Sequence, residues 1–279
     1  MKKILFCAIA LFSLSSLLKA QEQIPLYHTT DFPFSKTDVT VPTLTVFKPQ
    51  GNPGGTAVIV CSGGSYGRRA NEEEGTPVCQ KLVEAGITAF LLDYRLPNGH
   101  DSIPFADVQA AVRLLRENAA VYHIRKDRIG IMGFSAGGHL ASTITTHFNE
   151  HFDNSDSPVS VRPDFSVLVY PVISMTDELT HTGSRYNLLG KTPSDEEKEH
   201  FSNELQVTDQ TPPVFIVHAV DDGVVKVANT LYFAAALRQH RVSVEMFIYA
   251  KGGHGFGVDN RTVQVQWVEP CIKWIKDQK

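Results

Sequence analysis

The stretch Ile129-Gly130-Ile131-Met132-Gly133-Phe134-Ser135-Ala136-Gly137-Gly138-His139-Leu140 reads as an apolar strand that ends in the pattern G-x-S-x-G and runs directly into a helix. A serine at such a sharp strand-to-helix turn needs small residues two positions before and after it, and Gly133 and Gly137 meet that need. The helix that begins at Ala136 also points free N–H groups toward charge that develops beside the serine. The pattern therefore predicts that Ser135 is a catalytic nucleophile rather than an incidental residue of a βα turn.

Apolar strand-like runs alternate with helical runs along the rest of the chain. Strands are expected over residues 43–48, 56–61, 87–94, 165–170, 214–219 and 242–249. Helices are expected over residues 76–85, 103–119, 225–240 and 261–276. This alternation predicts an α/β fold with a mostly parallel sheet and helices on both faces. Residues 21–38 look like an irregular lead-in, strand 43–48 is expected at the sheet edge, and the polar stretch 174–211 is expected to be a small insertion of loops or short helices.

The first twenty residues form a separate segment of the sequence. A basic start, an apolar run over 4–18 and the small residue Ala20 predict a secretory signal peptide over 1–20. A single catalytic domain over 21–279 and a secreted or periplasmic location follow from that prediction. Cleavage would remove three lysines and no acid, so the mature chain is more acidic than the formal net charge of −4. That charge favours neither nucleic acid nor an anionic membrane as a partner.

Export would leave three cysteines, Cys61, Cys79 and Cys271, of which at most two can pair. A core of this size does not need a covalent crosslink, so we expect all three to be buried and unpaired, with one disulfide as the alternative. No Cys/His cluster has the spacing of zinc ligands, and we expect no metal and no other cofactor.

A serine hydroxyl becomes a strong nucleophile only when a base takes its proton and an acid orients that base. In sheets of this type the acid and then the base follow the serine along the chain, on loops after strands. His254 follows the strand 242–249 and has glycines on both sides, which is typical of an exposed loop that approaches another backbone closely. The sequence therefore predicts His254 as the general base. His139 and His218 are interpreted as structural.

Two adjacent acids, Asp221 and Asp222, follow the strand 214–219 and compete for the orienting role. Asp222 is favoured because its spacing to Val225 gives the pattern D-x-x-V. The other aspartate would then cap a helix or face solvent.

A glycine-rich loop, Ser62-Gly63-Gly64-Ser65-Tyr66, follows the strand 56–61. Backbone N–H groups on such a loop can stabilise the oxyanion of a tetrahedral intermediate. We expect donors at Gly64 and Ser65, with the N–H of Ala136 as a third. The alternative is an ordinary flexible surface turn.

Taken together, these segments resemble the α/β-hydrolase superfamily. The resemblance is carried by 62–66, 93–95, 133–139, 221–225 and 253–256, and it covers about residues 43–276. More closely, the chain resembles the secreted bacterial carbohydrate-esterase and feruloyl-esterase-like branch, which is related to the hormone-sensitive-lipase group. Segments 185–190, 201–203 and 212–213 also fit that branch. One departure is that the glycine loop begins Cys61-Ser62 where relatives have His or Pro, and Ser65 stands where a third glycine is usual.

The resemblance implies Ser135 as nucleophile, His254 as base and Asp222 as its orienter, with backbone donors near Gly64, Ser65 and Ala136. It also implies a serine carboxylesterase that works through an acyl-enzyme. The expected substrates are O-acetyl esters of plant polysaccharides or oligosaccharides, as for an acetylxylan esterase.

Two other functions share part of this pattern. A serine peptidase of the prolyl-oligopeptidase type shares the Gly-His-Gly-Phe ending, but such enzymes carry a large additional domain for which this chain has no room. A non-catalytic binding protein on the same fold would usually lack a triad member, and this chain has a candidate for each.

Overall fold

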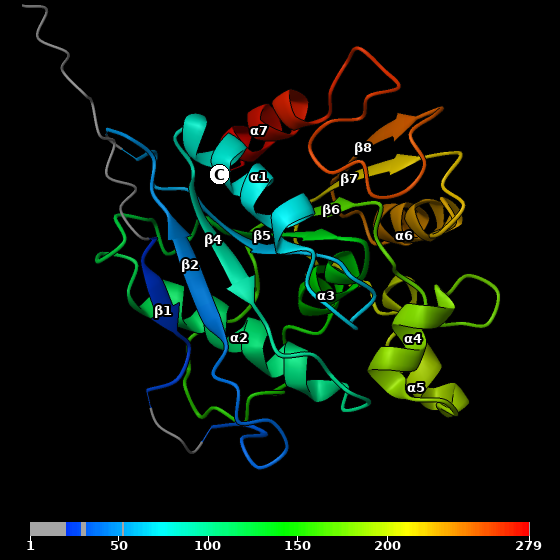
Figure 1. Cartoon of the computed structure of the whole chain (residues 1–279), viewed down its shortest axis with the longest axis horizontal. Coiled ribbons are helices and arrows are strands. Elements are labelled where there is room, and N and C mark those ends of the chain that lie inside the picture. Colours follow the sequence, from blue (N-terminus) through cyan, green and yellow to red (C-terminus); the bar gives the residue numbers. More distant parts are fainter. Residues whose placement is uncertain (1–20, 29–31, 52, 279) are drawn as a thin grey trace, which may run out of the picture.

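The computed structural model describes residues 21–28, 32–51 and 53–278, and its centre is an eight-stranded sheet (Figure 1). The strand order is β1-β2-β4-β3-β5-β6-β7-β8. The bounds are β1 Gln23–Pro25, β2 Thr43–Phe47, β3 Ala57–Cys61, β4 Thr88–Asp93, β5 Ile129–Phe134, β6 Ser166–Val169, β7 Val214–Ala219 and β8 Val244–Tyr249. β2 pairs antiparallel with β1 and β4, and every other neighbouring pair is parallel. The mostly parallel sheet predicted from the sequence is confirmed.

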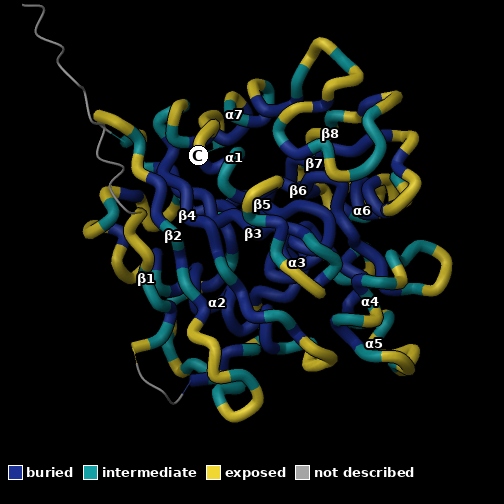
Figure 2. Tube along the Cα trace, viewed as in Figure 1, coloured by how far each residue is buried: buried dark blue, intermediate teal, exposed yellow. Residues whose placement is uncertain are grey.

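Helices cover both faces of the sheet, as Figure 1 shows. The main helices are α1 Thr76–Glu84, α2 Ser102–Glu117, α3 Ser135–Thr146, α6 Ala228–Gln239 and α7 Val268–Asp277. One hydrophobic core joins the sheet to α1 and α7, and a second joins the opposite face to α2, α3 and α6. A strand that is covered on both faces has no polar side, which explains why every residue of β3 is buried (Figure 2).

The polar stretch 174–211 forms short helices, as expected. They are α4 Thr182–Leu189, α5 Asp195–His200 and the 3₁₀ turn η2 Asn203–Leu205. α5 begins with a capping box in which Ser194 and Glu197 satisfy each other's backbone N–H groups, so a strongly charged segment of six residues still has a defined start.

Two details of the predicted elements are wrong. The lead-in contains β1, which pairs with β2, so β2 lies one strand inside the sheet edge. A three-residue, partly exposed strand has too little alternation to be read from sequence. The last helix begins at Val268 rather than near residue 261, because the Gln266 side chain accepts from the Asn260 backbone N–H and donates to its carbonyl, which holds a turn instead.

The three cysteines of the described chain, Cys61, Cys79 and Cys271, are all buried and unpaired. Burial raises the pKa of each thiol, which keeps all three in the unreactive thiol form. The prediction of free, structural cysteines is confirmed.

The predicted signal peptide, residues 1–20, lies outside the described residues and stays a prediction. Within 21–28, 32–51 and 53–278, no helix has both the length and the apolar character to cross a bilayer.

Candidate active site

Ser135 lies at the turn between β5 and α3 and has the left-handed backbone angle φ 51°. This conformation is costly for a residue with a side chain and persists only where the surrounding structure enforces it. The two flanking glycines make the turn sterically feasible. A Cβ atom at Gly133 would overlap the Gly137 carbonyl, and one at Gly137 would overlap the Cys61 carbonyl. The small residues are therefore required by close backbone approach.

Ser135 is joined by hydrogen bonds to His254 and through it to Asp222. The Ser135 Oγ lies 2.9 Å from His254 Nε2, and His254 Nδ1 lies 2.7 Å from Asp222 Oδ2. These three residues come from the ends of β5, β8 and β7, so the parallel sheet brings them to one edge. The predicted nucleophile, base and acid are thus brought together in a connected chain.

Asp222 is held in place by three further groups. Its Oδ1 accepts from the backbone N–H groups of Val224 and Val225, both at 2.9 Å. Its Oδ2 lies 3.2 Å from His218 Nε2, which also donates to the Val225 carbonyl and is therefore protonated at that nitrogen. Burial raises the pKa of Asp222, but the hydrogen bonds from His218 and His254 outweigh it and hold that pKa well below its usual range. The carboxylate is thus ionised whenever His254 needs an acceptor.

The neighbouring acid has a different position. Asp221 is exposed, and its Oδ1 accepts from the backbone N–H of Gly253 at 2.8 Å. It contributes to the shape of the loop that carries His254 without touching the imidazole. Of the two candidates, the structure places Asp222 beside His254.

The three predicted oxyanion donors belong to two turns beside Ser135. Gly64 and Ser65 have φ angles of 116° and 57°, and both line a cavity of about 480 Å³ together with Ser135 and His254. Ala136 opens the first turn of α3. Within the described ranges, the N–H groups of Gly64, Ser65 and Ala136 donate to no protein acceptor. Gly64 and Ser65 line the cavity itself, and Ala136 directly follows Ser135 on its wall.

A buried carboxylate that the sequence did not predict as part of the site lies next to this loop. Glu74 lies in the π-helical turn η1 Asn71–Gly75 that precedes α1, an irregularity that often marks functional positions. Its Oε2 accepts from the Gly63 N–H at 2.6 Å, and its Oε1 accepts from the Tyr170 hydroxyl at 3.0 Å. Burial raises the pKa of Glu74, and the hydrogen bonds from Gly63 and Tyr170 partly offset that rise.

Tyr170 was also missed, although it directly follows β6 at the same sheet edge. Its ring centroid lies 4.8 Å from that of His254, and its hydroxyl accepts from the Gly257 N–H at 3.1 Å. Glu74 and Tyr170 therefore connect the loop of the oxyanion donors to the loop of the base. The sequence pattern around these two residues gives little indication of a role in the site, since Glu74 is one of three consecutive glutamates and Tyr170 has the pattern of a strand residue.

Two more side chains fix the glycine-rich loop from the other side. The Tyr66 hydroxyl donates to His139 Nδ1 at 2.9 Å, because His139 Nε2 donates to the Phe201 carbonyl. Asn187 of α4 donates to the Ser65 carbonyl at 2.8 Å. The insertion thus contributes to the geometry of the donors. His139 and His218 are both buried and bonded, consistent with the structural roles expected of them.

One group of potential metal ligands occurs in the described part of the chain. The ligand atoms of His147, Glu150 and His200 lie within 4.8 Å of one another. The cluster is at the far end of α3 from Ser135, roughly 18 Å along a twelve-residue helix. Both ring nitrogens of His147 already have partners, Thr146 Oγ1 and the His200 carbonyl. The cluster is accounted for by hydrogen bonds and is separate from the Ser135 site.

Known proteins resemble this chain over most of its length. The model of the BD-FAE family matches residues 44–237, which include Ser135 and Asp222 and end before His254. An acetylxylan esterase of Xylanibacter ruminicola is 40% identical over 215 residues, covering 76% of this chain and 43% of the relative. Endo-1,4-beta-xylanase B of Butyrivibrio fibrisolvens is 38% identical over 209 residues, covering 73% and 33%. This chain therefore spans less than half the length of these two curated relatives.

A solved structure of similar extent also matches. The acetyl ester-xyloside bifunctional hydrolase of Caldicellulosiruptor lactoaceticus has a TM-score of 0.85 and 40% identity, covering 94% of this chain and 98% of that one. The resemblance inferred from sequence segments is confirmed. The chain belongs to the BD-FAE family of α/β-hydrolase-fold esterases.

Proposed function

We propose that this protein is a serine carboxylesterase that removes O-acetyl groups from plant polysaccharides or their oligosaccharide fragments, as an acetylxylan esterase does. The observation that carries the proposal is the continuous chain from Ser135 through His254 to Asp222 beside three free backbone N–H groups. A serine, a base and an acid in this order can form and hydrolyse an acyl-enzyme.

In the first half of the reaction the Ser135 Oγ attacks the ester carbonyl carbon while His254 Nε2 takes the hydroxyl proton. The carbonyl oxygen becomes an oxyanion and accepts hydrogen bonds from the N–H groups of Gly64, Ser65 and Ala136. His254 then passes its proton to the sugar oxygen, the C–O bond breaks, and acetyl remains on Ser135. Asp222 holds the Nδ1–H of His254 and stabilises the imidazolium through its negative charge.

In the second half a water molecule repeats the sequence. His254 removes a proton from the water as it attacks the acetyl carbonyl, and the same N–H groups bind the new oxyanion. His254 then returns the proton to the Ser135 Oγ, acetate leaves, and the enzyme is restored. Each donor of this kind is commonly worth about 10²–10³ in rate.

The choice of substrate is supported by the relatives. Two of them have names that refer to acetylxylan or to an acetyl ester and a xyloside, and a third is a xylanase. We therefore propose that this chain also acts on acetyl esters and that its substrates are plant polysaccharides of the xylan type.

The deciding experiment measures acetate release from acetylated xylan and acetylated pectin, and ferulate release from a feruloyl ester. We expect acetate from acetylated xylan, and no release by Ser135→Ala beyond the uncatalysed rate. A fluorophosphonate probe should label the wild-type protein at Ser135 and should not label the variant. Failure of a folded wild-type protein to react with this probe would point to a non-catalytic binding protein. Faster cleavage of proline-containing peptides than of acetyl esters would favour a peptidase.

Export is a separate part of the proposal. Residues 1–20 direct the chain out of the cytoplasm and are removed after Ala20. Mass spectrometry of protein recovered from the periplasm or the medium should give a chain that starts at Gln21, and a chain that retains residues 1–20 in the cytoplasm would contradict it.

A further inference from the structure

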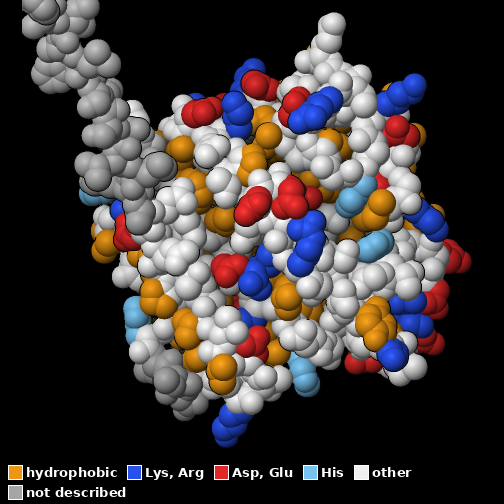
Figure 3. Space-filling model, in the orientation of Figure 1, with side chains coloured by type: hydrophobic (Ala, Val, Ile, Leu, Met, Phe, Trp, Pro, Cys, Tyr) orange, Lys and Arg blue, Asp and Glu red, His pale blue; other side chains and the backbone are white. Residues whose placement is uncertain are grey.

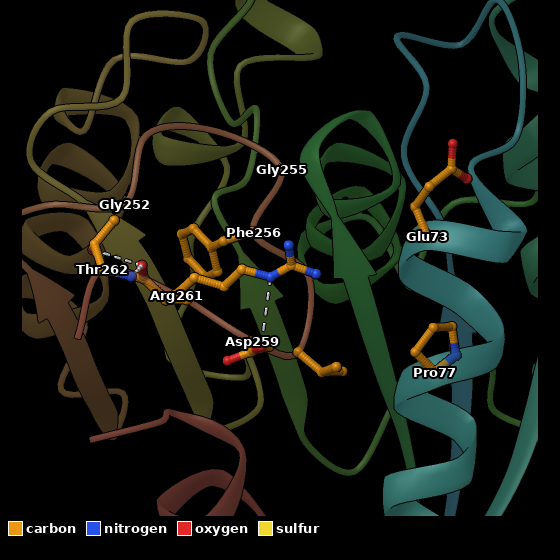
Figure 4. Close-up of a pocket in the computed structure, with 10 residues that line it drawn as sticks. Glu73, Pro77, Gly252, Gly255, Phe256, Asp259, Arg261 and Thr262 are labelled. Carbon is orange, nitrogen blue, oxygen red and sulfur yellow. Dashed lines mark hydrogen bonds and ion pairs between the residues drawn. The ribbon is translucent and has the colours of Figure 1, made fainter. Parts of the chain in front are cut away.

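A second cleft lies beside the Ser135 cavity and has no role in the mechanism above. It has a volume of about 430 Å³, within the usual range of roughly 300–1,000 Å³ for small-ligand sites. One wall is formed by Glu73 of η1 and Pro77 of α1, and the other by the loop 252–262, as Figure 4 shows. We call it the distal cleft.

The distal cleft and the Ser135 cavity are adjacent. Glu73 and Gly255 line both of them, so the two hollows meet at these residues. Gly255 directly follows His254, whose Nε2 must deliver its proton to the departing sugar oxygen. The sugar that carries the ester is therefore bound next to His254, and the rest of its chain can continue past Gly255 into the distal cleft.

The walls of the distal cleft suit a hydroxyl-rich ring. The half-buried Phe256 offers an apolar surface, anchored from behind by its edge contacts with Tyr170 and Tyr249. Arg261 and Asp259 extend from the same wall, and their side chains are 91% and 61% exposed. The two charged groups are 3.8 Å apart, too far for a strong mutual hydrogen bond, so both can bind hydroxyl groups.

The charged side chains around the distal cleft also indicate which class of ligand it binds. Acidic and basic side chains lie next to each other near the start of α1 on the face shown in Figure 3. Glu73 pairs with Arg68 at 3.2 Å, and Asp259 lies close to Arg261. Neither sign dominates, which favours a neutral ligand with many hydroxyl groups over a strongly charged one.

We propose that the distal cleft binds a neutral pyranose ring adjacent to the acetylated sugar, so that the protein prefers acetylated β-1,4-linked oligosaccharides to acetylated monosaccharides. Phe256 packs against the apolar face of this ring, while Arg261 and Glu73, from opposite walls, bind its hydroxyl groups. This inference rests on the proposed function for the identity of the substrate, and it adds a binding subsite to that function.

The test is calorimetric binding to the full-length protein carrying Ser135→Ala, which prevents turnover. The ligands are acetylated β-1,4-xylotetraose and acetylated xylose. We expect the tetrasaccharide to bind at least about tenfold more tightly, the size of one hydrogen bond to a charged group. Adding Arg261→Ala should remove most of this length-dependent gain, which is the higher affinity for the tetrasaccharide than for the monosaccharide. Adding Glu73→Gln, which changes the opposite wall of the cleft, should reduce the same gain. Both side chains are exposed, so neither change threatens folding.

The matched control is Arg238→Ala, an exposed arginine on α6 that lines neither hollow. It should keep the full length-dependent gain. Equal affinity for the two ligands, absence of binding, or a gain that survives Arg261→Ala would overturn the subsite. The binding experiment tests the subsite alone, because the Ser135→Ala protein does not turn over. Acetate release by the wild-type protein tests the proposed esterase activity alone, so the two claims can fail separately.

Discussion

The carboxylate of Glu74 accepts a hydrogen bond from the backbone N–H of Gly63 at 2.6 Å, immediately before Gly64 and Ser65, which line the Ser135 cavity. Gly63 has no room for a side chain, because a Cβ atom there would crowd the Glu74 carboxylate and the Ser135 Cβ. The other oxygen of Glu74 binds Tyr170, whose ring lies against His254. We infer that Glu74 is a positioning residue that holds the proposed oxyanion donors in place relative to the proposed base, His254.

Replacing Glu74 by alanine should lower kcat on p-nitrophenyl acetate by about 10²-fold, because the donors would lose their fixed direction. Glu74→Gln keeps an amide oxygen for the Gly63 N–H and is expected to stay within about tenfold of wild type. The measurement is steady-state kinetics with both variants, together with circular dichroism to show that they fold. Equal losses in the two variants, or an effect on KM alone, would contradict the positioning role.

The two adjacent aspartates can be separated by the same kind of experiment. Asp222→Asn should lower kcat by about 10⁴-fold, because an asparagine can stabilise the wrong tautomer of His254 and offers no charge to its imidazolium. Asp221→Asn should cost at most about tenfold, since Asp221 holds only one backbone N–H of the His254 loop. Release of p-nitrophenol from an acetyl ester measures both. A larger loss for Asp221→Asn than for Asp222→Asn would reverse the assignment.

Most of the fold could be predicted from the sequence because the patterns of apolar residues and glycines were pronounced. β3, β5 and β7 are wholly buried and mostly apolar. A loop with glycine or acidic residues follows β3 and β7, and β5 runs directly into α3. The G-x-S-x-G turn predicted Ser135 as nucleophile, and a histidine among glycines predicted His254 as base; the structure places the two in hydrogen-bond contact. Asp222 was separable from Asp221 by its spacing to Val225, whose N–H the structure shows bonded to Asp222.

What the sequence did not reveal depends on contacts between distant segments. Glu74 meets Tyr170 across 96 positions of the chain, and Asn187 meets Ser65 across 122. Neither glutamate nor tyrosine carries a local pattern that reports such a contact. The distal cleft is likewise formed by segments that are far apart in the chain, so its existence follows from the tertiary fold alone.

His139 should make the protein lose stability as the pH falls. Burial lowers the pKa of this histidine to about 4 from the usual 6.5, so below pH 6.5 the unfolded chain takes up a proton that the folded protein does not. The unfolding free energy should therefore fall by up to ~3 kcal/mol between pH 6.5 and pH 4. Glu74 and Asp107, whose pKa values are raised by burial, act in the opposite direction.

The comparison with His139→Gln isolates this contribution, because the other groups titrate in both proteins. Glutamine can still accept from Tyr66 and donate to the Phe201 carbonyl, which are the bonds His139 makes. Urea denaturation at several pH values should show wild type losing stability relative to the variant as the pH falls toward 4. A difference that is constant with pH would show that His139 is protonated equally in the folded and unfolded states.

The buried ion pair between Arg95 and Asp107 should be among the most sensitive points of the fold. Both side chains are fully buried, and their closest atoms are 2.6 Å apart. Arg95→Met would leave the Asp107 carboxylate buried without a counter-charge, at a cost of about 3–5 kcal/mol. Burial already raises the pKa of Asp107 to about 6 despite the bonds from Arg95, and loss of Arg95 would raise it further.

The destabilisation measured by urea denaturation should therefore be larger at pH 7.5 than at pH 5, where protonation removes the buried charge. The double variant Arg95→Met/Asp107→Leu should recover part of the loss at pH 7.5, and an equal loss at both pH values would show that the arginine acts only through packing.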